Sequence, residues 1–198
     1  MEREVCIKLE PIRDCDQITN EVQILKKLAG CKGVPTLLFS GTTQFQGEGY
    51  QAVVTDVVGE KNISELQIDI HSMVLLAKQA VDILHGIHKR GIMHNDIKPD
   101  HFVIKNNAMY LIDYGCSGPI GIPSKLETPK FASYFGFESE KKDFESLWYS
   151  FLSLCMKLPW DKNEIQELEE LNLRLKYSPE NQLKAFPQIA PIFSELLN

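Results

Sequence analysis

Residues 94–101 read His-Asn-Asp-Ile-Lys-Pro-Asp-His, and residues 113–115 read Asp-Tyr-Gly. Between these two stretches, short apolar runs flank Asn106 and Asn107, a pair that favours the tight turn of a β-hairpin. A hairpin at this point would bring Asp96 and Asp113 to one edge of the structure. This part of the sequence decides the fold, because it predicts that two acidic turns meet at a single site.

Asp96, Lys98 and Asp113 are the residue types that phosphoryl transfer from ATP requires. One carboxylate must orient the acceptor hydroxyl, a cation must lie beside the moving phosphoryl group, and a second carboxylate must hold a metal ion. The three side chains occur in this order along the chain. We prefer this interpretation to the alternative that both aspartates only form turns.

The overall composition is that of a globular protein. The 198 residues, 24% of them charged and 43% hydrophobic, suffice for one domain or for two small lobes that share a cleft. The net charge of -6 argues against nucleic acid or an anionic membrane as the main partner, because both attract basic proteins. We therefore expect neither a nucleic-acid partner nor a membrane partner.

The cysteines and the first residues indicate an intracellular protein. The five cysteines are scattered, their number is odd, and no two of them form a Cys-x-x-Cys pair. Residues 1–4 are charged rather than typical of a signal peptide, and no apolar run approaches the ~18 residues of a membrane-spanning helix. We expect reduced thiols and a cytoplasmic or nuclear location.

Strand patterns dominate residues 1–58, and helical patterns dominate residues 59–198. In the first part we expect one helix at residues 16–28 and strands at residues 4–9, 34–39 and 50–56. In the second part we expect helices at residues 71–89, 143–156, 163–175 and 191–197. The expected fold class is α+β, with a small strand-rich N-terminal lobe, a helical C-terminal lobe and the site at their junction.

The order of these features resembles that of the eukaryotic protein kinases. A Lys on an early strand, a Glu on the next helix, the motif at residues 94–101, the hairpin and the Asp-x-Gly turn follow one another as in that family. The resemblance covers nearly the whole chain and implies a bilobal fold with a shortened N-terminal lobe. More narrowly, the chain is similar to the casein kinase 1 and vaccinia-related kinase group. The stretches that carry this narrower likeness are residues 32–36, 96–104, 131–133, 142–148 and 158–160.

The resemblance implies a set of nucleotide-binding residues. Lys8 would hold the α- and β-phosphates of ATP and would be oriented by an ion pair with Glu21, thirteen positions later. Thr55 would lie at the back of the adenine pocket. The backbone from Asp56 to Val58 would form hydrogen bonds with the base.

The resemblance also implies which residues act on the phosphoryl group. Asp96 would orient the acceptor hydroxyl, Lys98 would neutralise charge on the γ-phosphate, and Asp113 would chelate Mg²⁺. A Lys two residues after the catalytic Asp is typical of Ser/Thr protein kinases, so the implied substrates are ATP and a protein hydroxyl. Asp143, on a helix expected to be buried, would brace the catalytic loop through backbone hydrogen bonds.

Three departures from the family pattern predict weak activity. His101 replaces an Asn that binds a second Mg²⁺, and imidazole suits Mn²⁺ or Zn²⁺ better than Mg²⁺. Asn95 replaces an Arg that commonly binds a phosphorylated activation segment, so we expect no switching by phosphorylation at residues 116–130. Because Lys8 lies so near the first residue of the sequence, we expect the usual Gly-rich loop over the phosphates to be missing.

These observations leave three functional hypotheses. The first is a Ser/Thr protein kinase of casein kinase 1-like type with low activity. The second is a pseudokinase that docks on, or competes with, a full-length kinase or its substrate, as a dimer or hetero-complex formed through an open N-terminal lobe. The third, a small-molecule phosphotransferase, is disfavoured by Lys98 and by the stretch at residues 131–133.

Overall fold

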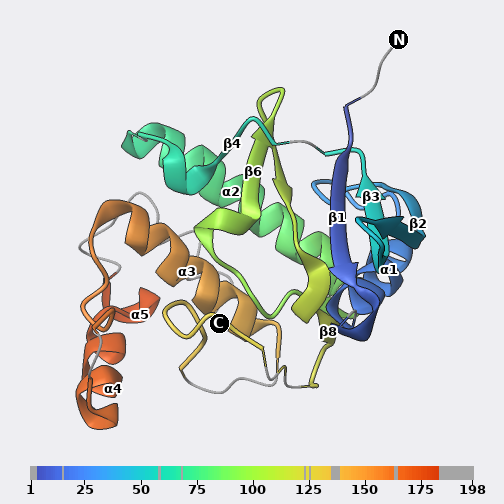
Figure 1. The fold of residues 1–198 in the computed structure, drawn as a ribbon. Coiled ribbons are helices and arrows are strands. Elements are labelled where there is room, and N and C mark those ends of the chain that lie inside the picture. Colours follow the sequence, from blue (N-terminus) through green and yellow to red (C-terminus); the bar gives the residue numbers. More distant parts are fainter. Residues whose placement is uncertain are drawn as a thin grey trace.

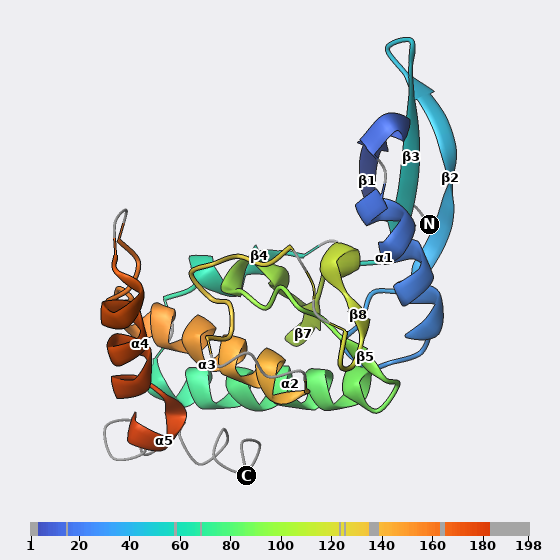
Figure 2. The ribbon, with the colours of Figure 1, turned by 90° about the horizontal axis from the view of Figure 1, so that it is seen from below.

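The computed structural model describes residues 4–14, 16–57, 59–67, 69–122, 124, 126–134, 139–162 and 165–182. In this part of the chain, a twisted sheet with one helix beside it stands next to a larger, mainly helical body (Figures 1 and 2). The expected α+β fold class, with strands first and helices later, is confirmed.

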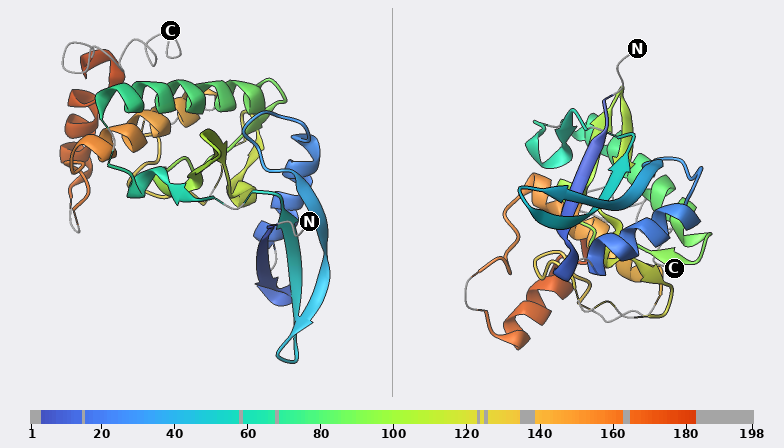
Figure 3. Two further views of the ribbon diagram at one scale, coloured as in Figure 1. Left: turned by 90° about the horizontal axis from the view of Figure 1, so that it is seen from above. Right: turned by 45° about the vertical axis from the view of Figure 1, so that its right-hand side comes forward.

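The N-terminal sheet has three antiparallel strands in the order β1-β3-β2. These are β1 (Cys6–Pro11), β2 (Leu37–Phe45) and β3 (Glu48–Thr55). The β2–β3 hairpin projects away from the rest of the molecule (Figure 3). Gln46 and Gly47 form its turn with φ angles of 52° and 84°, the left-handed backbone that a tight hairpin turn requires.

The strand expected at residues 34–39 was placed wrongly, because β2 begins at Leu37 and continues to Phe45. Its second half is largely exposed and carries Gly41, Thr42 and Thr43, so it shows no apolar alternation. Backbone pairing with β3 holds this half in the sheet instead.

Helix α1 (Asp16–Lys27) lies against the sheet and matches the expected helix at residues 16–28. It buries Ile18, Glu21 and Leu25 on one face, at the spacing of an amphipathic helix. Glu21 is the unusual member of this face, since a buried carboxylate needs a charged or hydrogen-bonding partner. Its partners lie in the site described below.

The helical body is built around α2 (Ile70–His88) and α3 (Lys141–Cys155), which run side by side (Figure 3). Asp69 caps α2 by accepting a hydrogen bond from the backbone N–H of Ser72 at 2.8 Å. The shorter helices α4 (Glu167–Lys176) and α5 (Pro179–Gln182) follow. Among the described residues, no helix has the length and apolar character needed to cross a membrane.

The described residues cover only part of the last two expected helices. Helix α4 begins at Glu167, four residues after the expected start at 163. Residues 163 and 164, and the helix expected at residues 191–197, lie outside the described residues.

The predicted hairpin after the residue 94–101 motif is confirmed. It consists of β6 (Phe102–Lys105) and β7 (Ala108–Leu111), and Asn106 and Asn107 form its turn with φ angles of 51° and 59°. Strand β4 (Lys61–Asn62) extends this sheet, and β5 (Ile92–Met93) pairs with β8 (Gly118–Pro119). The 3-10 turn η3 (Pro99–His101) comes directly before the hairpin, and the 3-10 turn η4 (Tyr114–Cys116) follows it. Because the two strands of the hairpin are antiparallel, both acidic motifs lie at the same edge.

Candidate active site

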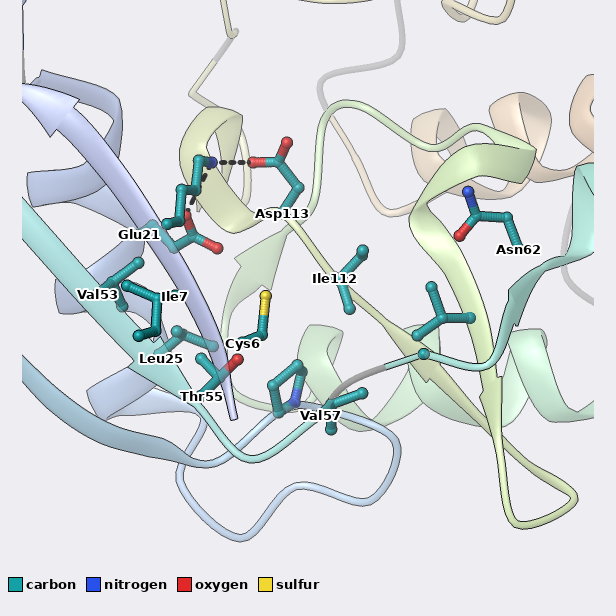
Figure 4. A pocket seen from close by; sticks show the side chains of 14 residues that line it. Cys6, Ile7, Glu21, Leu25, Val53, Thr55, Val57, Asn62, Ile112 and Asp113 are labelled. Carbon is teal, nitrogen blue, oxygen red and sulfur yellow. Dashed lines mark hydrogen bonds and ion pairs between the residues drawn. The ribbon is translucent and has the colours of Figure 1, made fainter. Parts of the chain in front are cut away.

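A cavity of about 460 Å³ lies between the N-terminal sheet and the helical body. Cys6, Leu25 and Val57 line an apolar part of it, whereas Glu21 and Asp113 mark its charged end (Figure 4). A ligand with a flat apolar portion and an anionic portion bound through a cation would match this division.

Lys8 lies at the charged end and joins two carboxylates. Its Nζ atom is 3.0 Å from Glu21 Oε2 and 2.8 Å from Asp113 Oδ1. Burial alone would lower the pKa of Lys8, but the charge of Glu21 and the hydrogen bond with Asp113 outweigh it and raise the pKa. The ion pair between Lys8 and Glu21 was expected, whereas the direct contact with Asp113 was not.

Asp113 follows β7 and has a left-handed backbone, with a φ angle of 65°. Burial would raise the pKa of its carboxyl group, but the hydrogen bond and charge of Lys8 lower it. The carboxylate therefore stays ionised, as a metal ligand must.

Asp96 forms the centre of a second cluster, with Lys98 and Thr128. Lys98 Nζ donates to Asp96 Oδ2 at 2.9 Å and to Thr128 Oγ1 at 3.0 Å. Thr128 donates to Asp96 Oδ1 from its backbone N–H at 2.9 Å and from its hydroxyl at 2.7 Å. Burial would raise the pKa of Asp96, but the hydrogen bonds from Lys98 and Thr128 lower it.

Thr128 is a site residue that the sequence analysis missed. It lies 32 positions after Asp96, so only the tertiary fold brings the two together. The one available signal was its place three residues before the stretch at 131–133 that carries the family resemblance.

His101 lies between the two clusters. Its Nδ1 atom is 2.8 Å from the backbone carbonyl of Asp96, and its Nε2 atom is 3.5 Å from Asp113 Oδ2. A carbonyl only accepts, so Nδ1 carries the proton and Nε2 presents a lone pair to the carboxylate. Burial, helped by the nearby His94 and Lys98, lowers the pKa of His101 to about 4 and keeps the imidazole neutral.

This geometry fits a divalent cation held by two protein ligands, Asp113 Oδ2 and His101 Nε2. The hydrogen bond from Nδ1 to the Asp96 carbonyl fixes the imidazole in the tautomer that a metal needs. Within the described residues there is no cluster of three or more His, Cys, Asp or Glu side chains suited to a metal ion. Further ligands would have to come from phosphate oxygens or water.

Asp143 braces the loop that carries Asp96, as expected. Its Oδ2 atom accepts from the backbone N–H of His94 at 2.8 Å, and its Oδ1 atom accepts from that of Asn95 at 2.9 Å. His88 Nε2 lies 2.8 Å from the same carboxylate, and both side chains are fully buried. Asn95 has a φ angle of 66°, and Asn tolerates this left-handed backbone better than a bulkier side chain.

The residues expected to contact the base are only partly brought together. Thr55 and Val57 both line the cavity. Asp56 is not part of the lining: its carboxylate accepts from the backbone N–H of Thr36 at 2.7 Å, and its carbonyl accepts from Lys105 Nζ at 2.8 Å. Val58 lies outside the described residues.

The site thus combines a cavity, a paired lysine, a carboxylate suited to a metal ion and a second carboxylate with its own cation. A comparison with protein families agrees with this combination, since the model of the protein kinase domain matches residues 5–138. The match covers more than half of the chain, and the chain therefore belongs to the protein kinase family.

Proposed function

We propose that this protein is a Ser/Thr protein kinase of casein kinase 1-like type, which transfers the γ-phosphoryl group of ATP to a protein hydroxyl with low activity. The observation that carries the proposal is the cluster of Asp96, Lys98 and Thr128. It supplies an ionised carboxylate and an adjacent cation, the two groups that the reaction needs beside the acceptor.

The protein's own residues divide the work. Asp96 orients the acceptor hydroxyl and takes its proton as the new O–P bond forms and the bond between the γ-phosphorus and the leaving ADP oxygen breaks. Lys98 lies beside this carboxylate. It would neutralise charge on the γ-phosphate. Thr128 holds both side chains from the segment opposite, which limits the positions that an acceptor can adopt.

The cavity is the proposed nucleotide site. The base lies at the apolar part near Cys6, Thr55 and Val57, and the phosphates lie at the end formed by Lys8 and Asp113. We propose that the backbone from Asp56 to Val58 also contacts the base. The carbonyl oxygen of Asp56 accepts from Lys105 and still has a second lone pair.

We propose Asp113 and His101 as the ligands of the metal ion that accompanies ATP. The ion would supply charge neutralisation between the phosphates. Because imidazole nitrogen is a poor ligand for the hard Mg²⁺ ion, we expect Mn²⁺ to support the reaction better than Mg²⁺.

A pseudokinase that acts as a binding module is the alternative, and a specific observation favours it. Lys8 contacts Asp113 at 2.8 Å, so the cation meant for the phosphates neutralises the carboxylate meant for the metal ion. Such a protein would dock on a full-length kinase, or on that kinase's substrate, through its N-terminal lobe.

Transfer of labelled γ-phosphate from ATP to casein and to the protein itself tests the proposal. The assay would compare the wild type with Asp96→Asn, in Mg²⁺ and in Mn²⁺. Transfer that disappears in the variant would support an enzyme with Asp96 as its base. Equal signals from both proteins, in either metal, would leave the binding module as the better account.

A further inference from the structure

The side chain of Asn20, on α1, forms hydrogen bonds with the backbone that follows Asp113. Its side-chain Nδ2 donates to the carbonyl of Gly115 at 3.0 Å and to that of Ser117 at 2.8 Å, and the carbonyl of Tyr114 lies at 3.5 Å. Carbonyl oxygens only accept hydrogen bonds, so the amide nitrogen must face them. The donor role of Asn20 therefore follows from its partners.

Two further hydrogen bonds hold the same segment, one from Asn95 on the loop after β5 and one to Glu21 on α1 itself. Asn95 Nδ2 donates to the carbonyl of Cys116 at 3.2 Å, and the backbone N–H of Tyr114 donates to Glu21 Oε1 at 3.3 Å. Consecutive carbonyls of Gly115, Cys116 and Ser117 thus each accept from an asparagine amide. These donors are neutral, so the arrangement depends on neither a phosphate group nor a charged clamp.

Helix α1 is itself fixed to the helical body at its far end. Arg90 Nη1, just after α2, donates to the carbonyl of Lys27 at 3.0 Å and to that of Ala29 at 2.9 Å. The first carbonyl belongs to the last residue of α1 and the second lies two residues beyond it. Unpaired carbonyl groups and the negative end of the helix dipole favour a cation at this position. Asn20 therefore connects the Asp113 segment to a helix that is already anchored.

We propose that Asn20 is a positioning residue for the nucleotide and metal site. By donating hydrogen bonds from α1 to residues 114–117, it keeps the side chain of Asp113 beside Lys8 and Glu21. This positioning does not require phosphorylation of the protein. This inference rests on the proposed function, because it assigns Asn20 to the same site. The hydrogen bonds of the uncharged Asn20 side chain act on the site through the position of Asp113 and not by contact with ATP.

Three variants separate the hydrogen bonds from the shape of the side chain. Asn20→Ala removes the donor, and Asn20→Asp keeps the shape but replaces the donor with an acceptor that faces three carbonyls. Gln23→Ala is the matched control, because Gln23 is an exposed amide side chain on the same helix. A role in packing alone would tolerate Asp, whereas a donor role would not.

The first readout is amide hydrogen exchange of residues 114–117 without nucleotide. We expect exchange to become roughly tenfold faster in Asn20→Ala and at least as fast in Asn20→Asp, the effect of losing about two hydrogen bonds. Gln23→Ala should exchange like the wild type. Unchanged exchange in both Asn20 variants would overturn the proposal.

The second readout is the affinity for a fluorescent ATP analogue, with and without Mn²⁺. We expect both Asn20 variants to lose most of the increase in affinity that Mn²⁺ gives the wild type, because Asp113 is no longer held. Affinity without metal should change little. If the wild type bound no nucleotide, the proposed function would fail, while the exchange measurement would still decide the role of Asn20.

Discussion

Two parts of the site differ in the partners of their charged groups: the acceptor end, formed by Asp96, Lys98 and Thr128, and the metal end, formed by Lys8, His101 and Asp113. At the end of the site proposed to bind the acceptor hydroxyl, Asp96 accepts hydrogen bonds from Lys98 and Thr128. At the metal end, Lys8 bonds to Asp113, and the carboxylate faces the lone pair of His101. If the proposed function holds, the first end needs no rearrangement before the reaction, whereas the second would have to exchange partners when a nucleotide and a metal ion bind.

The sharpest way to separate the two ends is Asp96→Asn. We expect it to reduce phosphoryl transfer by about a thousandfold, because a general base typically contributes 10²–10⁴ in rate. Affinity for ATP should stay within a factor of about two, since Asp96 belongs to the acceptor end. Rapid-quench transfer assays and nucleotide titrations on the same preparation would check both numbers. A parallel loss of ATP affinity would show that the ends are not separable.

The free energy of unfolding should also depend on pH through His101, the proposed metal ligand. His101 has a folded-state pKa of about 4. Its ordinary pKa is about 6.5, so between these values the unfolded chain binds a proton that the folded chain does not. The contribution of neutral His101 to the free energy of unfolding is fully present above pH 6.5. It falls as the pH drops toward 4, by up to about 3 kcal/mol.

His101→Asn provides the matched comparison, because Asn does not titrate. Urea unfolding at pH 7 and at pH 5 in the presence of a chelator should show a smaller loss of stability for the variant than for the wild type. An identical loss in both proteins would contradict a depressed pKa at His101.

A smaller effect is expected where Thr128 meets Asp96. Thr128→Ala removes the hydroxyl bonds to Asp96 and Lys98 but keeps the backbone bond, so transfer should fall roughly tenfold, as for one or two hydrogen bonds. Thr128→Ser retains the hydroxyl and should retain most of the activity. Steady-state rates with one protein substrate would distinguish the two variants. Equal losses in Ala and Ser would place the effect in packing of the methyl group.

The features that the sequence predicted either have local causes or follow from the family pattern. The turn at Asn106 and Asn107 was predictable because both residues adopt a left-handed backbone that Asn tolerates. Helix α1 was predictable from its apolar spacing, and the pairing of Lys8 with Glu21 followed from the family pattern.

The features that it missed depend on contacts between distant residues. Asn20 bonds to backbone that lies 97 positions away, and nothing in its neighbourhood on α1 marks it as different from Gln23. The placement of Asp56 was not predicted, because its carbonyl accepts a hydrogen bond from Lys105 on the distant β6–β7 hairpin. Strand β2 was misplaced because its exposed half is stabilised by pairing with β3 and not by burial.

The most direct test of the account is the metal dependence of phosphoryl transfer in the wild type and in His101→Asn. Transfer from labelled ATP to casein would be titrated with Mg²⁺ and with Mn²⁺ for each protein. The account predicts that Mn²⁺ supports the wild type better than Mg²⁺ and that His101→Asn shifts the preference toward Mg²⁺. Equal or stronger support of the wild type by Mg²⁺, or no transfer with either ion, would contradict it.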